Sequence, residues 1–188
     1  MKAKAILLLM LGFLCSNITA QINRNSTTVA SSGLTVTEET VPSVIEMDAF
    51  ISSQTTTNRK SSNHFSDAQN VSDLISQVQP SVYITLQGIN TYGENPKNLF
   101  IDFNSLKDLD NPSVLKNNIE IAIIKINNSQ ELNSTIDLSR FSAYKKLKYI
   151  YFISTVNATG ENFNKMIVNN NEKYSLFYKI NTGEGNHN

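Results

Sequence analysis

Residues 118–154 of this 188-residue chain read NIEIAIIKINNSQELNSTIDLSRFSAYKKLKYIYFIS, and this stretch decides the fold class. It contains two nearly continuous apolar runs, residues 119–126 and 147–153, with a polar segment that can form a short helix between them. Both runs have the length of a strand, are rich in β-branched and aromatic residues, and are bounded by turn-forming residues, which is typical of buried strands. Two such strands joined through a helical segment predict a parallel crossover.

Similar segments lie on both sides of this stretch. Residues 82–87 and 99–103 alternate along the chain as strands do, and residues 174–180 supply a last strand. We therefore predict a single α/β domain over residues 70–181, with a small, mostly parallel sheet and short intervening helices. An α+β domain with a mixed sheet is the alternative.

A helix is expected at the start of this domain. Asn70 or Ser72 can cap it, and Pro80 ends it. Its expected apolar face consists of Val71, Leu74, Ile75 and Val78. The segment after residue 87, up to residue 97, carries Gly93, Asn95 and Pro96 and is predicted to be a loop.

One unit of the chain resembles a leucine-rich repeat. Leu138 and Phe141 are followed by Leu147, Ile150 and Phe152, which fit the LxxLxL core of such repeats. Weaker echoes occur at Pro96, Leu99 and Ile101, and at Ile119 and Ile121, while Thr155 stands where the repeat has Asn or Cys. The resemblance implies a truncated arc of parallel strands with a repeat of about 20–30 residues.

The two ends of the chain are expected to lie outside the domain. Residues 1–20 combine Lys2 and Lys4 with an apolar segment and small residues up to Ala20, which predicts a cleaved signal peptide. The mature protein is then exported to the periplasm, the cell surface or the medium of a bacterium. Residues 21–69 are rich in Ser, Thr and Asn and are predicted to be largely disordered, apart from residues 41–51. These are expected to form a helix that docks on the domain, with a conditional partner-binding segment as the alternative. Residues 182–188 are expected to form a flexible tail.

Charge and cysteine content exclude several classes of protein. The chain is formally neutral, and its densest basic cluster, residues 145–148, is short, so no nucleic-acid partner is expected. Cys15, the only cysteine, lies in the signal peptide, so the mature protein is predicted to have neither disulfides nor thiolate metal sites. No membrane span is expected after signal cleavage.

Few residues suit catalysis. His64 lies in the Ser/Asn-rich segment and His187 next to the end of the chain, where neither is held by a rigid frame. Residues 108–111 could offer oxygen atoms to calcium, but they lack the other ligands of an EF-hand loop, and a solvated helix end is the preferred interpretation. No cofactor or metal is predicted, and a non-catalytic protein is favoured over an enzyme.

One face of the predicted sheet differs from the other. Alternation puts apolar residues, including Ile119, Ile121 and Ile123, on one face, which is interpreted as the core. The opposite face is rich in tyrosine and charge, and its candidate partner-binding residues are Tyr83, Phe100, Asp102, Glu120, Tyr149, Tyr151 and Phe177.

Three interpretations of this tyrosine-rich face remain open. It can bind a protein or a glycan, because tyrosine offers apolar area together with a polar group. Helices or the N-terminal segment can instead cover it. Asp102 and Glu120 can also act as the carboxylate pair of a glycoside hydrolase, if they lie close together. The sharpest expectation is that Tyr149 and Tyr151 are exposed side by side.

Overall fold

The computed structural model describes residues 43–56, 62–170 and 173–181, all of which belong to one compact unit, Glu39–Asn188. Side chains are described from residue 67 onward, and up to residue 53 in the first range. The predicted signal peptide, most of the Ser/Thr/Asn-rich segment before residue 43 and the predicted tail therefore lie outside the described residues. So do the side chains of both histidines.

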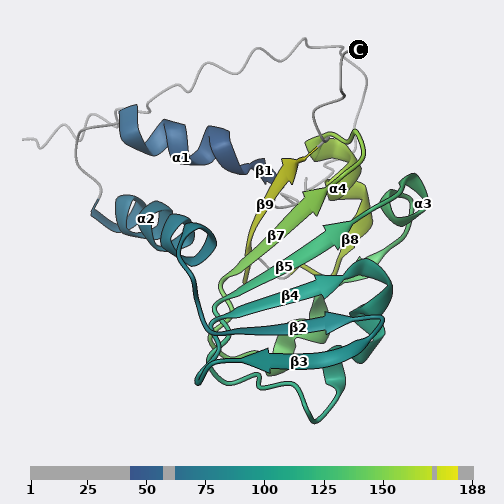
Figure 1. Ribbon diagram of the computed structural model, residues 1–188. Helices are drawn as coiled ribbons and strands as arrows, with labels where there is room; N and C mark the ends of the chain where they lie inside the picture. Colours follow the sequence, from purple (N-terminus) through teal and green to yellow (C-terminus); the bar gives the residue numbers. More distant parts are fainter. Residues whose placement is uncertain (1–42, 57–61, 171–172, 182–188) are drawn as a thin grey trace, which may run out of the picture. The chain divides into compact units, whose positions relative to one another are not determined.

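A seven-stranded sheet forms the centre of this unit (Figure 1). Its order is β1-β9-β7-β5-β4-β2-β3, and every neighbouring pair is parallel except β2 with β3. The strands are β1 (Ile45–Glu46), β2 (Ser81–Thr85), β3 (Gly88–Tyr92), β4 (Asn98–Asp102), β5 (Ile121–Ile126), β7 (Tyr149–Ser154) and β9 (Ser175–Ile180). The predicted α/β class and the parallel pairing of β5 with β7 are confirmed.

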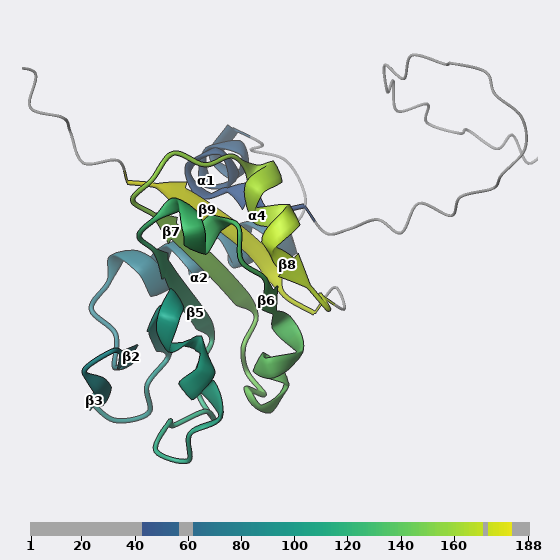
Figure 2. The ribbon, with the colours of Figure 1, turned by 90° about the vertical axis from the view of Figure 1, so that its right-hand side faces the viewer.

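Short helices and a small second sheet connect the strands from β4 onward (Figure 2). They are η1 (Phe103–Asp110), α3 (Ser129–Leu132), β6 (Ile136–Asp137), η2 (Leu138–Ala143), α4 (Gly160–Met166) and β8 (Ile167–Val168), with β6 and β8 paired in parallel. Their apolar side chains, such as Leu109, Phe141 and Phe163, pack with Leu99, Ile150 and other strand residues in one core. All of these connections therefore lie on the same face of the sheet.

The opposite face carries helices α1 (Met47–Thr56) and α2 (Ser62–Ser76). Met47, Val71 and Leu74 from these helices form a second core with Tyr149 and other residues of β5, β7 and β9. The expected docking helix near residues 41–51 is thus α1, which begins later than its apolar pattern suggested. Helix α1 and the first half of α2 lie before residue 70, so the compact unit begins upstream of the boundary expected from composition.

Several details differ from the sequence-based expectations. Asn70 and Ser72 lie inside α2 rather than at its start, and Val78, expected on its apolar face, lies beyond its end and is fully exposed. The segment predicted to be a loop after residue 87 contains β3, which pairs antiparallel with β2. A two-residue hairpin at Leu86 and Gln87 lacks the glycine or asparagine that normally signals such a turn, although Gly88 follows it.

The face assignment of β5 is wrong by one residue. Ala122 and Ile124 align with Leu99 and Ile101 on the face of the connections, so Ile121 and Ile123 belong to the tyrosine-rich face. The run IAIIKI is apolar at both odd and even positions, so alternation alone cannot choose between its two faces. The hydrogen-bonded register between β4 and β5 determines which residues of β5 lie on which face of the sheet.

Candidate functional site

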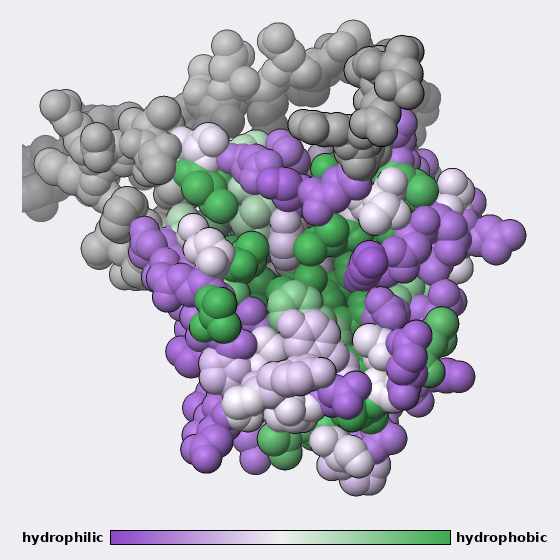
Figure 3. Space-filling view, viewed as in Figure 1, coloured by the Kyte–Doolittle hydropathy of each residue, from purple (hydrophilic) through white to green (hydrophobic). Residues whose placement is uncertain are grey.

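A hollow of about 280 Å³ lies on the half of the tyrosine-rich face that α1 and α2 leave open. It is formed toward the carboxyl ends of β2, β4, β5 and β7 by Tyr83, Thr85, Phe100, Ile101, Asp102, Ile123, Lys125 and Ile153. Figure 3, in the view of Figure 1, shows apolar surface near the middle of this face, bordered by hydrophilic residues. We call this hollow the apolar slot.

Aromatic rings form one wall of the apolar slot. Phe100 on β4 stacks on Tyr83 of β2, with ring centroids 4.7 Å apart and planes 9° from parallel. Tyr83 in turn meets the edge of Tyr92 on β3, with centroids 5.5 Å apart. These contacts restrain the rings, so the wall is formed before any ligand binds.

The floor and the second wall come from the next two strands. Ile123 of β5 is 4 % exposed and lies between Phe100 of β4 and Tyr151 of β7 in the register. Ile153 of β7 is half-buried and lines the far side. Two strand spacings, about 10 Å, therefore separate Phe100 from the strand of Ile153. After allowance for the side chains themselves, the space between them is wide enough for one aromatic ring or one branched aliphatic side chain.

Two opposite charges stand at the end of the apolar slot. Asp102 and Lys125 are neighbours in the register of β4 and β5, at the carboxyl ends of these parallel strands. Within the part of the chain that the structure describes, neither side chain has an ion-pair partner. Both side chains can therefore interact with polar groups of a ligand whose apolar part lies in the slot.

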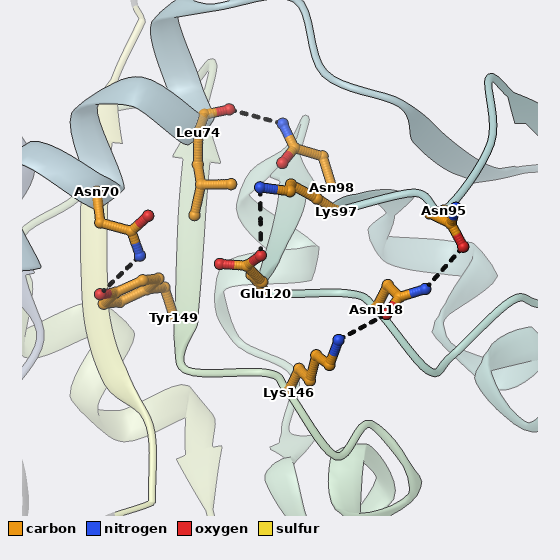
Figure 4. A network of polar contacts seen from close by, with 9 residues as sticks. All are labelled: Asn70, Leu74, Asn95, Lys97, Asn98, Asn118, Glu120, Lys146 and Tyr149. Carbon is orange, nitrogen blue, oxygen red and sulfur yellow. Dashed lines mark hydrogen bonds and ion pairs between the residues drawn. The ribbon is translucent and has the colours of Figure 1, made fainter.

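The expectation that Tyr149 and Tyr151 are exposed is wrong. Each is 3 % exposed, and Phe177 is 2 % exposed, because α1 and α2 pack over them. The Tyr149 hydroxyl accepts a hydrogen bond of 3.3 Å from the Asn70 amide (Figure 4). It donates another of 3.3 Å to the Asp67 carboxylate. Burial raises the pKa of Tyr149, and it raises the pKa of Tyr151 to about 12.

The structure separates the two carboxylates proposed for hydrolysis. Glu120 precedes β5 at the amino end of the sheet, where it pairs with Lys97 at 3.6 Å (Figure 4). Asp102 lies at the opposite end of β4, five residue steps away in the register, which corresponds to roughly 16 Å. This distance exceeds the separation of about 5–9.5 Å that glycoside hydrolysis requires.

The described residues form neither a metal site nor the calcium site considered from the sequence. No group of three or more His, Cys, Asp or Glu side chains that could hold a metal occurs among the described residues. Asp110, from the acidic segment considered for calcium, pairs with Arg140 at 3.1 Å. A larger hollow of about 390 Å³ lies beside the turn between β2 and β3, and its lining residues come from β2, β3, η1 and the adjoining loops.

None of the described helices is both long enough and apolar enough to cross a membrane.

Three of the seven predicted partner-binding residues, Tyr83, Phe100 and Asp102, line the apolar slot. Five lining residues were not among the predicted partner-binding residues, namely Thr85, Ile101, Ile123, Lys125 and Ile153. Ile123 was assigned to the wrong face, and Ile153 belongs to an apolar run in which nothing distinguishes an open position from a covered one. Lys125 interrupts an otherwise apolar strand, and this interruption was the one available signal for an open position.

A scan of the chain against protein-family models found no match, and neither did searches of curated proteins and of solved structures.

Proposed function

We propose that this chain is a non-catalytic binding module of the bacterial cell envelope or exterior, and that its apolar slot receives an apolar side chain of a protein partner. The observation that carries this proposal is the slot itself. Helices α1 and α2 cover Tyr149, Tyr151 and Phe177 on the same sheet face, whereas Phe100 and Ile153 stay partly accessible. An aromatic-walled pocket of this kind is typical of the central anchor site of a protein interface.

The lining favours a protein over a glycan. Each sugar hydroxyl that enters a site needs a polar partner, and the apolar slot offers polar side chains only from Thr85, Asp102 and Lys125. An apolar side chain needs no such partner, and the neighbouring residues of a peptide can reach the charges of Asp102 and Lys125.

The register supports the resemblance to leucine-rich repeats. When the strands are aligned by their pairing, the three apolar positions of the LxxLxL pattern fall at the same places in β4, β5, β7 and β9. The third residue after each pattern is Asn in three strands and Thr in β7. The frames are Pro96-Leu99-Ile101, Ile119-Ala122-Ile124, Leu147-Ile150-Phe152 and Lys173-Leu176-Tyr178, followed by Asn104, Asn127, Thr155 and Asn181. We infer a repeat-like arc whose free strand face serves for binding.

The proposal is tested by filling the apolar slot. Peptides selected by the purified chain from a random peptide display library are expected to carry an aromatic or branched aliphatic residue at a constant position. Ile153→Phe places a larger side chain in the slot and should weaken binding of the selected peptides at least about tenfold, the equivalent of one lost apolar anchor. Isothermal titration calorimetry measures the change.

Ile45→Phe is the matched control, because Ile45 is an exposed isoleucine on β1 at the far edge of the same sheet. It should leave the affinity unchanged. Selected peptides without a shared apolar residue, or equal affinity in the parent chain and in Ile153→Phe, would overturn the proposed function.

A further inference from the structure

Strand β3 forms an edge of the sheet whose outer side has no partner among the described residues. Thr85 and Gly88 close the two-residue turn between β2 and β3, so they form a hydrogen-bonded pair, and such pairs alternate along an antiparallel ladder. The backbone groups of Gly88, Asn90 and Tyr92 therefore point toward β2. Those of Ile89 and Thr91 point outward and remain free to pair.

This edge lacks the features that normally protect an edge strand. β3 reads GINTY, with neither a charged residue nor proline, and its pairing with β2 is continuous over five residue pairs without a bulge. Four of its five residues are exposed, including Tyr92 at 62 %. Lysine, proline and bulges are the usual means of preventing strand addition, so β3 is open to another strand.

We propose that β3 pairs antiparallel with β3 of a second copy of this chain, with Asn90 of the two copies at the twofold axis. This register places Ile89 opposite the partner's Thr91, so the outward backbone groups of both strands form about four hydrogen bonds. The two Asn90 side chains face each other on the tyrosine-rich face of the joined sheet.

Side chains fit the same register. Tyr92 lies opposite the partner's Gly88, and no atom lies within 4 Å of the position that a Cβ atom on Gly88 would occupy. The Tyr92 ring touches Tyr83 of its own chain by an edge contact but is still 62 % exposed, so it can cover this glycine as an aromatic cross-strand pair. Ile89 and Thr91 form a second pair of β-branched residues on the other face.

A second copy of the chain is the proposed partner of β3, because two β3 strands can pair with each other in one antiparallel register. One register satisfies all outward backbone groups and covers both glycines, as an isologous contact about a twofold axis requires. The joined sheet presents both apolar slots on one continuous face.

Charge substitution at Asn90 tests the register. The purified chain is expected to show a reversible monomer–dimer equilibrium in sedimentation-velocity experiments over a range of concentrations. Asn90→Lys and Asn90→Glu each place like charges face to face in a homodimer and should weaken it at least about tenfold. An equimolar mixture of these two variants should recover a one-to-one heterodimer, which added salt weakens.

A second variant tests the backbone pairing. Thr91→Pro removes an outward N–H that has no partner in the monomer, so proline is tolerated there in the fold but not in the dimer. Thr91→Val keeps the N–H and should dimerise like the parent chain. Circular dichroism and thermal melts show that each variant is folded, and the Asn90 variants remain informative if Thr91→Pro does not fold.

A chain that stays monomeric at the highest attainable concentration overturns the proposal. So does a dimer that Asn90→Lys and Asn90→Glu leave unchanged, or a mixture of the two that forms no heterodimer. These outcomes are independent of peptide binding at the apolar slot, which the Ile153→Phe experiment tests separately.

Discussion

Single residues decide how much of the tyrosine-rich face can bind. Tyr149 and Tyr151 lie on this face, as alternation along the strand predicts. Both rings are core residues, however, because they lie beneath helices α1 and α2. Phe100, on the same face two strands away, remains partly open. Residue type and alternation are the same for the covered and the open rings, so only their neighbours in space distinguish them.

Truncation of the covered tyrosines should destabilise the fold. Tyr149→Ala and Tyr151→Ala each remove a ring that is 3 % exposed, and each is expected to lower the free energy of unfolding by about 3–5 kcal/mol. Urea unfolding measures the loss. Tyr151→Phe, which keeps the ring, should remain close to the parent chain at pH 7. A loss below about 1 kcal/mol in both alanine variants would contradict the covered arrangement.

The same tyrosines predict an alkaline limit to stability. Burial raises the pKa of Tyr151 to about 12 and also raises the pKa values of Tyr149 and Tyr144, whereas an unfolded tyrosine titrates near pH 10. Between these values the unfolded state binds fewer protons than the folded state, so stability falls as the pH rises. The melting temperature should decline from about pH 10 upward, and less steeply in Tyr151→Phe. Identical slopes in both proteins would contradict this assignment.

At the scale of elements, a side-chain hydrogen bond joins the carboxyl end of α2 to strand β4 of the sheet. The buried Asn98 amide on β4 donates a hydrogen bond of 2.7 Å to the Leu74 carbonyl, one of the last carbonyls of α2 (Figure 4). Carbonyls in the last turn of a helix have no partner within the helix, so this side chain replaces water at a buried helix end. The contact holds α2 over Tyr149 and away from the apolar slot.

Loss of this contact should loosen α2. Asn98→Ala leaves the Leu74 carbonyl without a partner and is expected to lower the free energy of unfolding by about 1–3 kcal/mol. Amide hydrogen exchange should rise in α2 more than in β5 and β7. Gln69→Ala is the control on the same helix, because it removes only an exposed hydrogen bond to Asp73 and should cost about 0.5 kcal/mol or less. Equal effects of the two variants would contradict the fastening role of Asn98.

At the scale of the whole molecule, segments before residue 57 complete the second core. Met47 of α1 is 2 % exposed, the Phe50 ring lies 4.8 Å from that of Phe177, and Asp48 pairs with Lys179 at 2.9 Å. β1 adds a parallel edge strand beside β9. The composition of residues 21–69 predicted disorder, with a docking helix near residues 41–51 as the exception. The apolar residues of α1 are buried because a sheet face is present to receive them.

Removal of β1 and α1 should therefore weaken the domain. A chain that starts at residue 57 is expected to be less stable by about 3–5 kcal/mol than one that starts at residue 43, since it loses the burial of Met47 and of its neighbours. It should also bind the fluorescent dye ANS more strongly, because Phe177 and Tyr151 become exposed. Urea unfolding and dye fluorescence measure both effects. Equal stability of the two chains would show that α1 contributes nothing to the second core.

The sequence by itself determined strands β2, β4, β5, β7 and β9 and their mostly parallel arrangement with short helices between them. These features depend on local patterns, namely strand-length apolar runs separated by short amphipathic segments, and on the few ways in which such units can pack. It also placed Tyr83, Phe100 and Asp102 on one face, since alternation along a strand is a local property.

Only the tertiary structure decided which face Ile121 and Ile123 occupy and which half of the tyrosine-rich face stays open. The first choice depends on register between strands. Both phases of the run 119–126 are mostly apolar, and Glu120 interrupts one phase while Lys125 interrupts the other, so the run shows no clear preference of its own. The second depends on α1 and α2, which reach β7 from more than seventy residues away in the chain, as the Asn70–Tyr149 contact shows. Burial is a property of neighbours in space, and neighbours so distant in sequence leave no local pattern.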